Sequence, residues 1–550
     1  MTQAPNIALK ITLAQINPIV GNLSYNMDKI RATWKDVPQD TDLIIFPEMI
    51  ICGYPPEDLV LKPFFMDSVE QAIKALVDES KNHNAALLLS TPWRIDGKTY
   101  NAIHLVHKGK ILATRTKRHL PNYGVFDEQR LFTPGPLPEP MEFKDIQLGV
   151  MVCEDMWHSD SAGYLKQKGA EILIVINASP FDSKKHDIRL HLAQARTDET
   201  GLPLLYVNQV GGQDELVFDG GSFVLDDKGI QKIRFPEFEE RLDTITFKKN
   251  DNGIAFTGDQ NLPPPLREHE SIYRAVALGL HDYIEKNNFP GVLLGLSGGI
   301  DSALSAAIAV DALGPERVHC VMMPSRYTSQ DSLDDAKEQA DALGIKLDTI
   351  PIEPVVEQFN TIMSDHKDSS VTFENIQSRT RAVILMGLSN ATEKMVLSTG
   401  NKSEMAVGYA TLYGDMCGGF NALKDIYKTQ VYELARWRNE QGQVIPERVI
   451  AKIPTAELKD NQSDQDTLPP YETLDDILMC LIEQDMSIND IAKRGHGREM
   501  VEKIWQMLGR AEYKRWQSPP GIKITSRAFG RDRRYPITNH FVNLIEKSGI

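Results

Sequence analysis

The eight residues from Gly295 to Ser302, Gly-Leu-Ser-Gly-Gly-Ile-Asp-Ser, constrain the fold of this 550-residue chain more than any other segment. They lie between an apolar run at 292–296, the pattern of a buried strand, and a run of small residues at 303–313 that is typical of a helix. The adjacent glycines Gly298 and Gly299 let backbone N–H groups approach an anion without interference from a Cβ atom. The start of the helix adds unsatisfied N–H donors and the positive end of its dipole. This segment therefore predicts a phosphate-binding turn between a strand and a helix.

The side chains of this turn suit a phosphorylated ligand. Ser297 and Ser302 can donate hydroxyl hydrogen bonds, and Asp301 is placed to hold Mg²⁺ against phosphates. The turn is not a Walker A loop, because the chain's Gly-Lys-Thr at 97–99 has Pro92 where the first glycine should stand. Nor is it a dinucleotide fingerprint, because the chain's Gly-x-Gly at 495–497 has Met500 where the third glycine should stand.

The second half of the chain alternates strand and helix patterns around this turn. A helical segment at 271–287 precedes it, and further apolar strand patterns follow at 317–323, 346–352 and 395–400, with helical patterns between them. Such alternation predicts a parallel, doubly wound α/β sheet. Ligands bind such a sheet outside the carboxyl ends of its strands, where the turn also lies.

The first half carries a separate α/β pattern. Buried strands are predicted at 43–46, 86–90, 148–152, 172–176 and 204–207. Because amphipathic segments separate them, we expect an α/β sandwich. Residues 248–269 are polar and include a proline triplet at 263–265, which predicts a linker. The expected domains are therefore 1–247 and 270–550, joined by 248–269.

Three residues of the first half follow or flank its strands in a pattern suited to acyl transfer. Glu48 and Cys153 each follow a predicted strand, and Lys117 lies in a polar segment between them. A carboxylate can accept a thiol proton, an ammonium can stabilise a tetrahedral intermediate, and a thiolate can attack a carbonyl carbon. Taken one by one, such residues are more often a core thiol or solvated charges, so the hypothesis depends on the three together.

Composition narrows the classes of function. The net charge of −16 argues against nucleic acid as a partner. No segment has the roughly 18 apolar residues of a membrane helix, and the first 15 residues have the pattern of a strand rather than of a signal peptide. Five widely spaced cysteines suggest neither a disulfide framework nor a zinc site. We therefore expect a cytoplasmic protein.

Both patterns resemble known superfamilies. The Ser-Gly-Gly-x-Asp-Ser motif resembles the pyrophosphate loop of N-type ATP pyrophosphatases, which cleave ATP to AMP and pyrophosphate. Glu48, Lys117 and Cys153 resemble the catalytic triad of the nitrilase (carbon–nitrogen hydrolase) superfamily over residues 6–245. This resemblance implies a general base, an electrophilic stabiliser and a nucleophile, in that order, with Glu128 as a supporting glutamate. The implied fold class is α/β: an N-terminal nitrilase-like αββα sandwich and a C-terminal Rossmann-like, doubly wound parallel sheet.

The two halves together resemble the bacterial glutamine-dependent NAD synthetases, and four further segments of the second half carry this resemblance. They are residues 374–379, 398–404, 408–437 and 511–536. The resemblance implies that ATP is contacted by Gly295, Leu296, Ser297, Gly298, Gly299, Ile300, Asp301, Ser302 and Thr399. It implies that Asn375, Glu404 and Lys514 contact deamido-NAD, and that Glu404 shares Mg²⁺ with Asp301.

In the amidase half, the same resemblance assigns glutamine binding to Tyr123, Ser179 and Lys185. The family often has arginine where Lys185 stands, and lysine meets a carboxylate as a point charge rather than as a bidentate fork. The resemblance further implies ATP as co-substrate, no tightly bound organic cofactor, a homo-oligomer, and an enclosed passage for ammonia. The expected partners are small molecules (glutamine, ATP and deamido-NAD), with no nucleic acid and no membrane.

Other interpretations stay open from the residues alone. Residues 398–404 have the composition of a helix cap as well as of a ligand-binding edge. The basic cluster after Lys514 suits a diphosphate substrate but is also typical of a solvated face. The same two modules could amidate another carboxylate, or a plain amidase could carry a regulatory nucleotide module. A non-enzymatic interaction protein would leave both catalytic patterns unexplained.

Overall fold

The computed structural model describes residues 7–250, 253–366, 370–460 and 462–541. The chain divides into two compact units, Met1–Leu266 and Arg267–Ile550, and each is described by itself. Among the described residues, no helix combines the length and the apolar character needed to cross a membrane.

Two β-sheets form the centre of the first unit. The seven-stranded sheet has the order β15-β14-β1-β2-β3-β4-β5, and the six-stranded sheet has the order β13-β12-β9-β8-β7-β6. The strands of the first sheet, in chain order, are β1 (Ile7–Gln15), β2 (Leu43–Ile45), β3 (Ala86–Ile95), β4 (Lys98–His107), β5 (Lys110–Thr116), β14 (Arg241–Asn250) and β15 (Gly253–Thr257). Those of the second are β6 (Met141–Phe143), β7 (Ile146–Val152), β8 (Ile172–Asn177), β9 (Leu204–Asn208), β12 (Phe223–Leu225) and β13 (Gln231–Arg234). The predicted strands of this half are confirmed.

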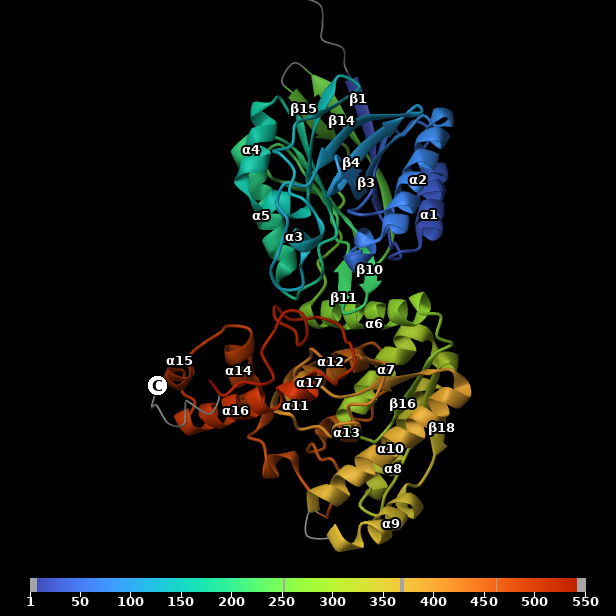
Figure 1. Ribbon diagram of the computed structural model, residues 1–550, viewed down its shortest axis with the longest axis vertical. Coiled ribbons are helices and arrows are strands. Elements are labelled where there is room, and N and C mark those ends of the chain that lie inside the picture. The colour runs from blue at the N-terminus through green and yellow to red at the C-terminus, as the bar shows by residue number, and fades with distance from the viewer. Residues whose placement is uncertain (1–6, 251–252, 367–369, 461, 542–550) are drawn as a thin grey trace, which may run out of the picture. The chain divides into compact units, whose positions relative to one another are not determined.

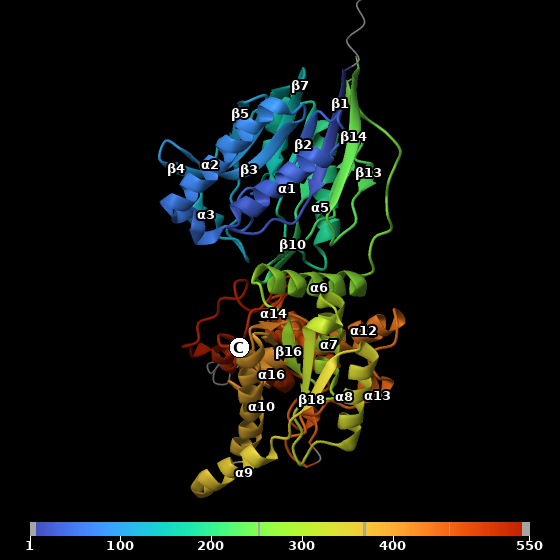
Figure 2. The ribbon, with the colours of Figure 1, turned by 90° about the vertical axis from the view of Figure 1, so that its right-hand side faces the viewer.

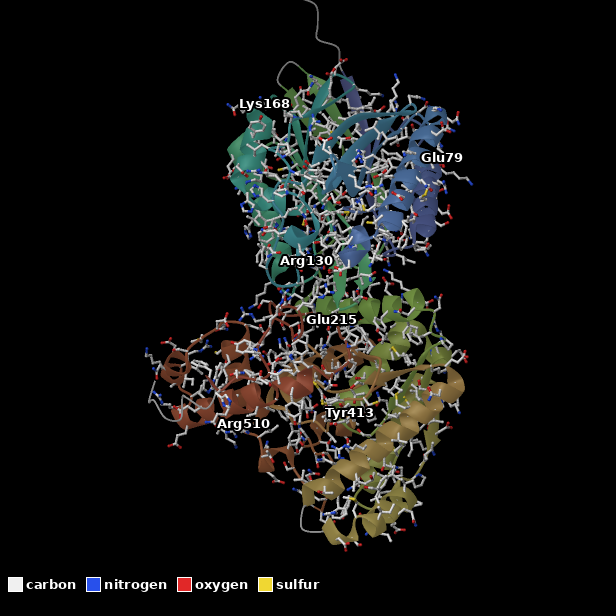
Figure 3. The ribbon with its side chains drawn as sticks, viewed as in Figure 1. Glu79, Arg130, Lys168, Glu215, Tyr413 and Arg510 are labelled. Carbon is white, nitrogen blue, oxygen red and sulfur yellow. The ribbon has the colours of Figure 1, made fainter. Side chains whose placement is uncertain are left out.

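Helices cover the outer face of each sheet, which gives the four-layered αββα sandwich (Figure 1). Helices α1 (Leu23–Asp36) and α2 (Pro63–Glu79) pack on the seven-stranded sheet. Helices α4 (Ser159–Gln167) and α5 (Lys185–Thr200) pack on the six-stranded sheet. Figure 3 shows side chains filling the interior, with Glu79 and Lys168 on opposite outer faces. The predicted αββα class is confirmed.

The sheets pack together through apolar side chains that alternate along their strands. Leu9, Ile11 and Leu13 of β1 face the same core as Ile172 and Ile174 of β8, and all five are 0% exposed. Because side chains of a strand alternate between its two faces, this spacing buries one face of β1 against the other sheet.

The end of the first unit differs from the predicted linker at 248–269. Strands β14 and β15 continue the seven-stranded sheet as far as Thr257, and helix α6 (Glu268–Lys286) begins at Glu268. Phe247 and Ile254 are buried in the core between the sheets, while polar side chains alternate with them. An edge hairpin with a polar outer face resembles a linker in composition, which is why the pattern was misleading.

The second unit contains one parallel sheet with the order β18-β17-β16-β19-β20. In chain order its strands are β16 (Val292–Gly295), β17 (Val318–Met322), β18 (Lys346–Thr349), β19 (Met395–Ser398) and β20 (Phe420–Asn421). Helices α7 (Ile300–Leu313) and α8 (Gln330–Leu343) lie on one face, and α10 (Ser370–Thr392) lies on the other (Figure 2). The strand order reverses between β16 and β19, so the predicted doubly wound class is confirmed and its switch point is at these two strands.

Further helices surround this sheet. They are α9 (Glu353–Ile362), α11 (Lys402–Val407), α12 (Lys428–Glu440), α13 (Glu447–Ala451), α14 (Tyr471–Ile482), α15 (Ile488–Lys493), α16 (Arg498–Arg510) and α17 (Glu512–Arg515). Leu474 and Leu478 of α14, Ile504 of α16 and Met405 of α11 share one apolar cluster. This packing holds α11, which follows strand β19, beside the switch point.

Candidate functional site

Three charged side chains meet inside the first unit. The Lys117 Nζ atom lies 2.8 Å from Oε1 of Glu48 and 2.8 Å from Oε1 of Glu128. The side chains of Lys117 and Glu48 are 0% exposed. Asn101 donates to Glu48 Oε1 (2.7 Å), the Ala178 backbone N–H donates to Glu48 Oε2 (3.1 Å), and the Tyr54 hydroxyl donates to Glu128. Two carboxylates therefore share one buried ammonium, and each is oriented by neutral donors.

Cys153 occupies a strained turn next to this cluster. Strand β7 ends at Val152, and Cys153 begins a 3₁₀ turn, Cys153–Trp157, with a φ of +44°. A non-glycine residue in this left-handed region costs about 1–3 kcal/mol and is frequent at active sites. The sharp turn ends the strand, and it leaves the buried Cys153 side chain at the edge of the apolar core between the two sheets.

The charges around Cys153 favour a protonated thiol at rest. Burial raises the pKa of Cys153, and the Glu48 carboxylate raises it further, although the Lys117 ammonium opposes both. Burial would lower the pKa of Lys117, but Glu128 and Glu48 hold it well above its ordinary value. Burial also raises the pKa of Glu128 to about 7, against the opposing effect of Lys117. The thiol therefore needs a base at the moment of attack, and Glu48 is the carboxylate placed to act as one.

Asp155 joins the two loops that carry the lysine and the cysteine. Its Oδ1 accepts the backbone N–H groups of Arg118 (3.0 Å) and His119 (2.8 Å), directly after Lys117. Its Oδ2 accepts the N–H of Val152 (3.1 Å), directly before Cys153. Asp155 is 1% exposed, and burial raises its pKa to about 6. The sequence reasoning missed this residue, although its position two residues after the cysteine was a usable signal.

Two of the side chains predicted to bind glutamine lie around one aromatic ring. The Lys185 Nζ atom is 5.5 Å from the centre of the Phe126 ring, and the Tyr123 ring is 5.5 Å from the same ring, centre to centre. The Tyr123 hydroxyl donates to Glu154 Oε2 (2.9 Å). Glu154 directly follows Cys153, so a carboxylate that the sequence reasoning missed links Tyr123 to the segment that carries the thiol.

Ser179, the third predicted glutamine ligand, is held from behind by a buried ion pair. Arg189 donates to the Ser179 hydroxyl (3.1 Å) and carbonyl (2.8 Å), and its other donors bind both Asp219 oxygens (2.8 and 2.7 Å). Asn208 accepts the Ser179 N–H (2.9 Å). Arg189 is 2% exposed, so it positions Ser179 from within the core.

In the second unit, the glycine-rich turn has the geometry that its sequence predicts. Gly298 has a φ of +77°, and a Cβ atom there would lie 2.4 Å from the Ser332 carbonyl oxygen. Only glycine fits this position, for both conformational and steric reasons. The serine hydroxyls mainly shape the turn: Ser302 donates to the Gly299 carbonyl (2.9 Å) and lies 3.0 Å from the Ser297 oxygen. The hydroxyls also accept the N–H groups of Ser297 (3.2 Å) and Gly299 (3.3 Å), so an anion would be bound by the other N–H groups of the turn and of the start of α7.

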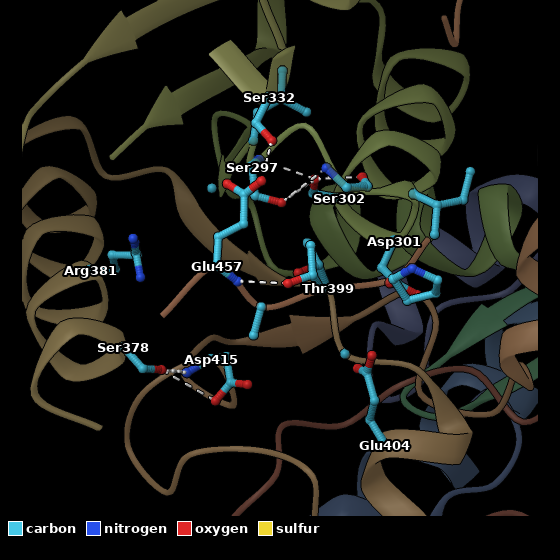
Figure 4. Close-up of a pocket in the computed structure, with 18 of the residues that line it drawn as sticks. Ser297, Asp301, Ser302, Ser332, Ser378, Arg381, Thr399, Glu404, Asp415 and Glu457 are labelled. Atoms are coloured by element: carbon cyan, nitrogen blue, oxygen red, sulfur yellow. Dashed lines mark hydrogen bonds between the residues drawn. The ribbon is translucent and has the colours of Figure 1, made fainter. Parts of the chain in front are cut away.

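A cavity of about 300 Å³ opens at this turn. Seven of the eight turn residues line it, all except Gly298, together with Thr399 and Glu404. Figure 4 shows Arg381 and Ser378 across the cavity from Asp301. Burial lowers the pKa of Arg381 to about 10, so the guanidinium stays charged at neutral pH. Arg381, Lys428 and Asp464 also line the cavity, and the sequence reasoning missed all three.

Asp301 and Glu404 come from different motifs but share two partners. Asn401 donates to Asp301 Oδ1 (2.9 Å) and through its backbone N–H to Glu404 Oε2 (3.3 Å). The Lys428 ammonium donates to Asp301 Oδ2 and lies 3.6 Å from Glu404 Oε1. Burial raises the pKa of Glu404 to about 8, and the Asp301 charge adds to the effect while Lys428 opposes it. The predicted pair of metal ligands is therefore brought together.

The donor set suits Mg²⁺ rather than a softer metal. Mg²⁺ is commonly held by one or two carboxylates and completes its octahedron with water and substrate phosphates. Within the described ranges, no group of three or more histidine, cysteine and acidic side chains is arranged to hold a metal by itself. A site of two carboxylates beside a phosphate-binding turn therefore fits an ion that arrives with a nucleotide.

Asn375 and Lys514, predicted to contact deamido-NAD, do not line the cavity with Glu404. Asn375 accepts the Thr411 hydroxyl (2.8 Å), and the Lys514 ammonium donates to the carbonyls of Gly408 (2.8 Å) and Ala410 (2.7 Å). Thr411 itself lines the cavity. Both predicted ligands thus hold the segment 408–411 at the rim of the cavity.

The basic C-terminal segment differs from the face suggested by its composition. Lys523 pairs with Asp532, Arg533 pairs with Glu512, and all four side chains are at most 8% exposed. These cations neutralise buried carboxylates, so they do not form a continuous basic surface for a diphosphate. Composition could not show this, because their acidic partners are separated from them in sequence.

Comparison with known proteins agrees with the family resemblance predicted for each half of the chain. Residues 10–251 match the family model for carbon–nitrogen hydrolase, and residues 272–518 match that for NAD synthase. The chain is 48% identical to the glutamine-dependent NAD(+) synthetase of Rhodobacter capsulatus, over 97% of this chain and 98% of that protein. It is 45% identical to the protein of the same name from Xanthomonas campestris, with the same coverage. A solved structure of glutamine-dependent NAD+ synthetase from Acinetobacter baumannii, in complex with ADP, is 42% identical, with a TM-score of 0.78 and coverage of 97% and 99%.

Proposed function

Because the chain belongs to the family of glutamine-dependent NAD(+) synthetases, we propose that its first unit releases ammonia from glutamine and its second unit uses that ammonia to amidate deamido-NAD. The protein is a carbon–nitrogen ligase with glutamine as nitrogen donor and ATP as co-substrate. The observation that carries the division of labour is the buried Glu48–Lys117–Glu128 cluster beside Cys153, in the same chain as the Gly298 turn.

In the first unit, Glu48 accepts the proton of the Cys153 thiol, and the sulfur attacks the side-chain amide carbon of glutamine. The Lys117 ammonium stabilises the negative charge on the tetrahedral intermediate. Ammonia leaves with a proton returned from Glu48, which leaves a γ-glutamyl thioester. Water, activated by the same carboxylate, then releases glutamate and restores the thiol.

Glutamine binds as a zwitterion, and the site offers a partner for each charge. Lys185 suits the α-carboxylate, and Glu154, which accepts a hydrogen bond from Tyr123, suits the α-ammonium. Ser179, held by Arg189, supplies a fixed polar contact. In this assignment Tyr123 comes from the segment after β5, whereas Ser179 and Lys185 come from the connection between β8 and the start of α5.

In the second unit, the nicotinate carboxylate of deamido-NAD attacks the α-phosphorus of ATP, and pyrophosphate leaves. The N–H groups of the Gly298 turn and the start of α7 bind the phosphates, and Arg381 lies across the cavity with a further positive charge. Ammonia then attacks the acyl adenylate, and AMP leaves as NAD forms. The ADP in the solved relative from A. baumannii supports the binding of an adenine nucleotide by this chain.

Asp301 and Glu404 would hold Mg²⁺, which neutralises phosphate charge when it is bound. Asn375 and Lys514 would act by shaping the rim at 408–411, where deamido-NAD approaches.

We extend the proposal to a cytoplasmic location, a homo-oligomer and an enclosed passage for ammonia, on the family resemblance. Light scattering of the purified protein tests the oligomer.

The product assay that tests this function combines deamido-NAD, ATP and Mg²⁺ with either glutamine or ammonium. NAD, AMP and pyrophosphate are expected in equal amounts with either nitrogen source. Glutamate release without NAD or AMP would favour the other candidate, an amidotransferase with a different carboxylate acceptor or a plain amidase.

Gly298→Ala is expected to weaken ATP binding by about tenfold or more, because left-handed backbone costs about 1–2 kcal/mol for alanine and the new Cβ atom meets the Ser332 carbonyl. Gly344→Ala is the matched control: its backbone is also left-handed, with a φ of +65°, but nothing lies within 4 Å of the new Cβ atom. Calorimetric titration with ATP should separate the two variants. Equal loss in both would mean that backbone strain, rather than the shape of the turn, is responsible.

Asp155→Asn is expected to slow glutamine hydrolysis by about 10- to 100-fold, since hydrogen bonds to a charged group contribute about 1.5–3 kcal/mol. Asparagine offers one acceptor oxygen and cannot serve both loops. The wild-type rate should also fall as the pH drops through about 6, where the Asp155 carboxyl protonates and loses an acceptor. That acid limb should be absent from the pH profile of Asp155→Asn. Asp36→Asn, a change at an exposed carboxylate at the end of helix α1, should keep both the rate and the limb, and loss of the limb there would contradict the assignment.

A further inference from the structure

Lys428 lies where a divalent cation would have to bind. It is the first residue of helix α12, it is 2% exposed, and its ammonium faces both Asp301 and Glu404. The Lys428 backbone N–H donates to the Ser403 hydroxyl (2.9 Å), so the start of the helix is fixed beside α11. The Tyr471 ring, 5.4 Å from the Nζ atom, lies beside the ammonium.

Each of the two carboxylates has one oxygen engaged by Asn401 and the other directed at Lys428. For Asp301 these are Oδ1 and Oδ2, and for Glu404 they are Oε2 and Oε1. A divalent cation held by both carboxylates would compete for the oxygens directed at Lys428, because the other two oxygens are engaged by Asn401, which is 0% exposed and forms the cap of helix α11. An ammonium and a divalent cation cannot share those oxygens, since they repel each other and use the same lone pairs.

The Lys428 ammonium could also pair with a different anion, the phosphates of a bound nucleotide. Lys428 lines the cavity at the glycine-rich turn. Phosphate oxygens bound in this cavity would therefore lie within reach of its flexible side chain. Lysine is a compact point charge on a four-carbon stem, which suits an exchange of partners better than the planar fork of arginine.

We propose that Lys428 is an exchangeable counter-ion, which neutralises the Asp301–Glu404 pair in the nucleotide-free protein and moves to the phosphates when the nucleotide binds. The move releases the two carboxylate oxygens for the divalent cation. This inference rests on the proposed metal role of Asp301 and Glu404. Its consequence is that the protein binds a divalent cation weakly without nucleotide, so metal and nucleotide binding are coupled, and the coupling is reciprocal.

The test measures Mn²⁺ binding by electron paramagnetic resonance, with the full-length protein and no nucleotide. Lys428→Met is expected to bind Mn²⁺ at least about tenfold more tightly than the wild type, because the competing ammonium is gone. The same variant should bind metal-free α,β-methylene-ATP, measured in EDTA, at least about tenfold more weakly, because a phosphate contact is lost. A purely structural role for Lys428 would not move the two affinities in opposite directions.

Two controls make the result specific. Lys452→Met removes another lysine of the same cavity, which pairs with Glu457 instead (2.8 Å), and should leave nucleotide-free Mn²⁺ affinity unchanged. Lys428→Arg keeps the charge and should bind Mn²⁺ as weakly as the wild type.

Unchanged or weaker Mn²⁺ binding by Lys428→Met would overturn the proposal. So would tight one-to-one Mn²⁺ binding by the nucleotide-free wild type, a measurement that needs no variant. Asp301→Asn separates this outcome from failure of the proposed function. If that variant kept nucleotide-dependent Mn²⁺ binding, the metal role of Asp301 itself would be wrong.

Discussion

Replacing Cys153 with alanine is expected to lower glutamine-driven NAD synthesis by about 10⁴-fold or more, the scale of losing a catalytic nucleophile. Ammonia-driven synthesis should stay close to the wild-type rate, because Cys153 belongs to the first compact unit and ATP chemistry to the second. NAD formation, followed in parallel with glutamine and with ammonium, gives both rates from one preparation. The ammonium arm also reports whether the variant is folded.

Cys52→Ala provides the matched control for this variant. Cys52 is also a buried thiol in the first unit, four residues after Glu48, but its sulfur contacts the Gly53 carbonyl (3.3 Å). It should keep glutamine-driven synthesis, apart from the modest loss of stability expected for a smaller core side chain. If Cys153→Ala lost both activities while remaining folded, the assignment of one task to each unit would be wrong.

Asp301→Ala is expected to lower AMP formation by about 10²- to 10³-fold with either nitrogen source, since it removes a carboxylate from the place where phosphate charge must be balanced. Glutamine hydrolysis should continue, because the Glu48–Lys117–Cys153 site is intact. The change also removes the partner of the Lys428 ammonium and of the Asn401 amide, so stability must be measured beside activity. Thermal unfolding with and without ATP supplies that measurement.

Asp334→Ala, an exposed carboxylate change on helix α8, is the control for general loss of negative charge. It should leave AMP formation unchanged. A normal rate of ATP cleavage in Asp301→Ala would refute the metal role of this residue and leave phosphate binding to the Gly298 turn alone.

The local geometry of both candidate sites could be predicted from the sequence. The turn from Gly295 to Ser302 requires glycine at 298 for a left-handed backbone and a close approach to Ser332, and this need is visible in the sequence as adjacent glycines between a strand and a helix. The strand predictions at 148–152 and 292–296 held because apolar runs of this length have few other stable placements in an α/β fold. Strand ends then indicated where Glu48 and Cys153 would lie.

Hydrogen-bond and ion-pair partners that are distant in sequence could be identified only from the tertiary structure. Asp155 follows Cys153 closely, but its bonds to the backbone of Arg118 and His119 cross 37 and 36 positions of the chain. Lys428 reaches Asp301 across 127 positions, and its role at the carboxylate pair has no local sequence signal.

The sequence by itself determined the two α/β patterns, the place of the Cys153 thiol at a strand end and the glycine-rich turn, because periodicity and turn chemistry act over a few neighbouring residues. Only the tertiary structure decided which charged side chains pair with one another and which are left to bind a ligand. The basic residues Lys523 and Arg533 counted as a positive face by composition, yet Asp532 and Glu512 neutralise them inside the unit. The physical reason is that burial makes an unpaired charge costly, so the fold selects partners by proximity in space, which composition does not record.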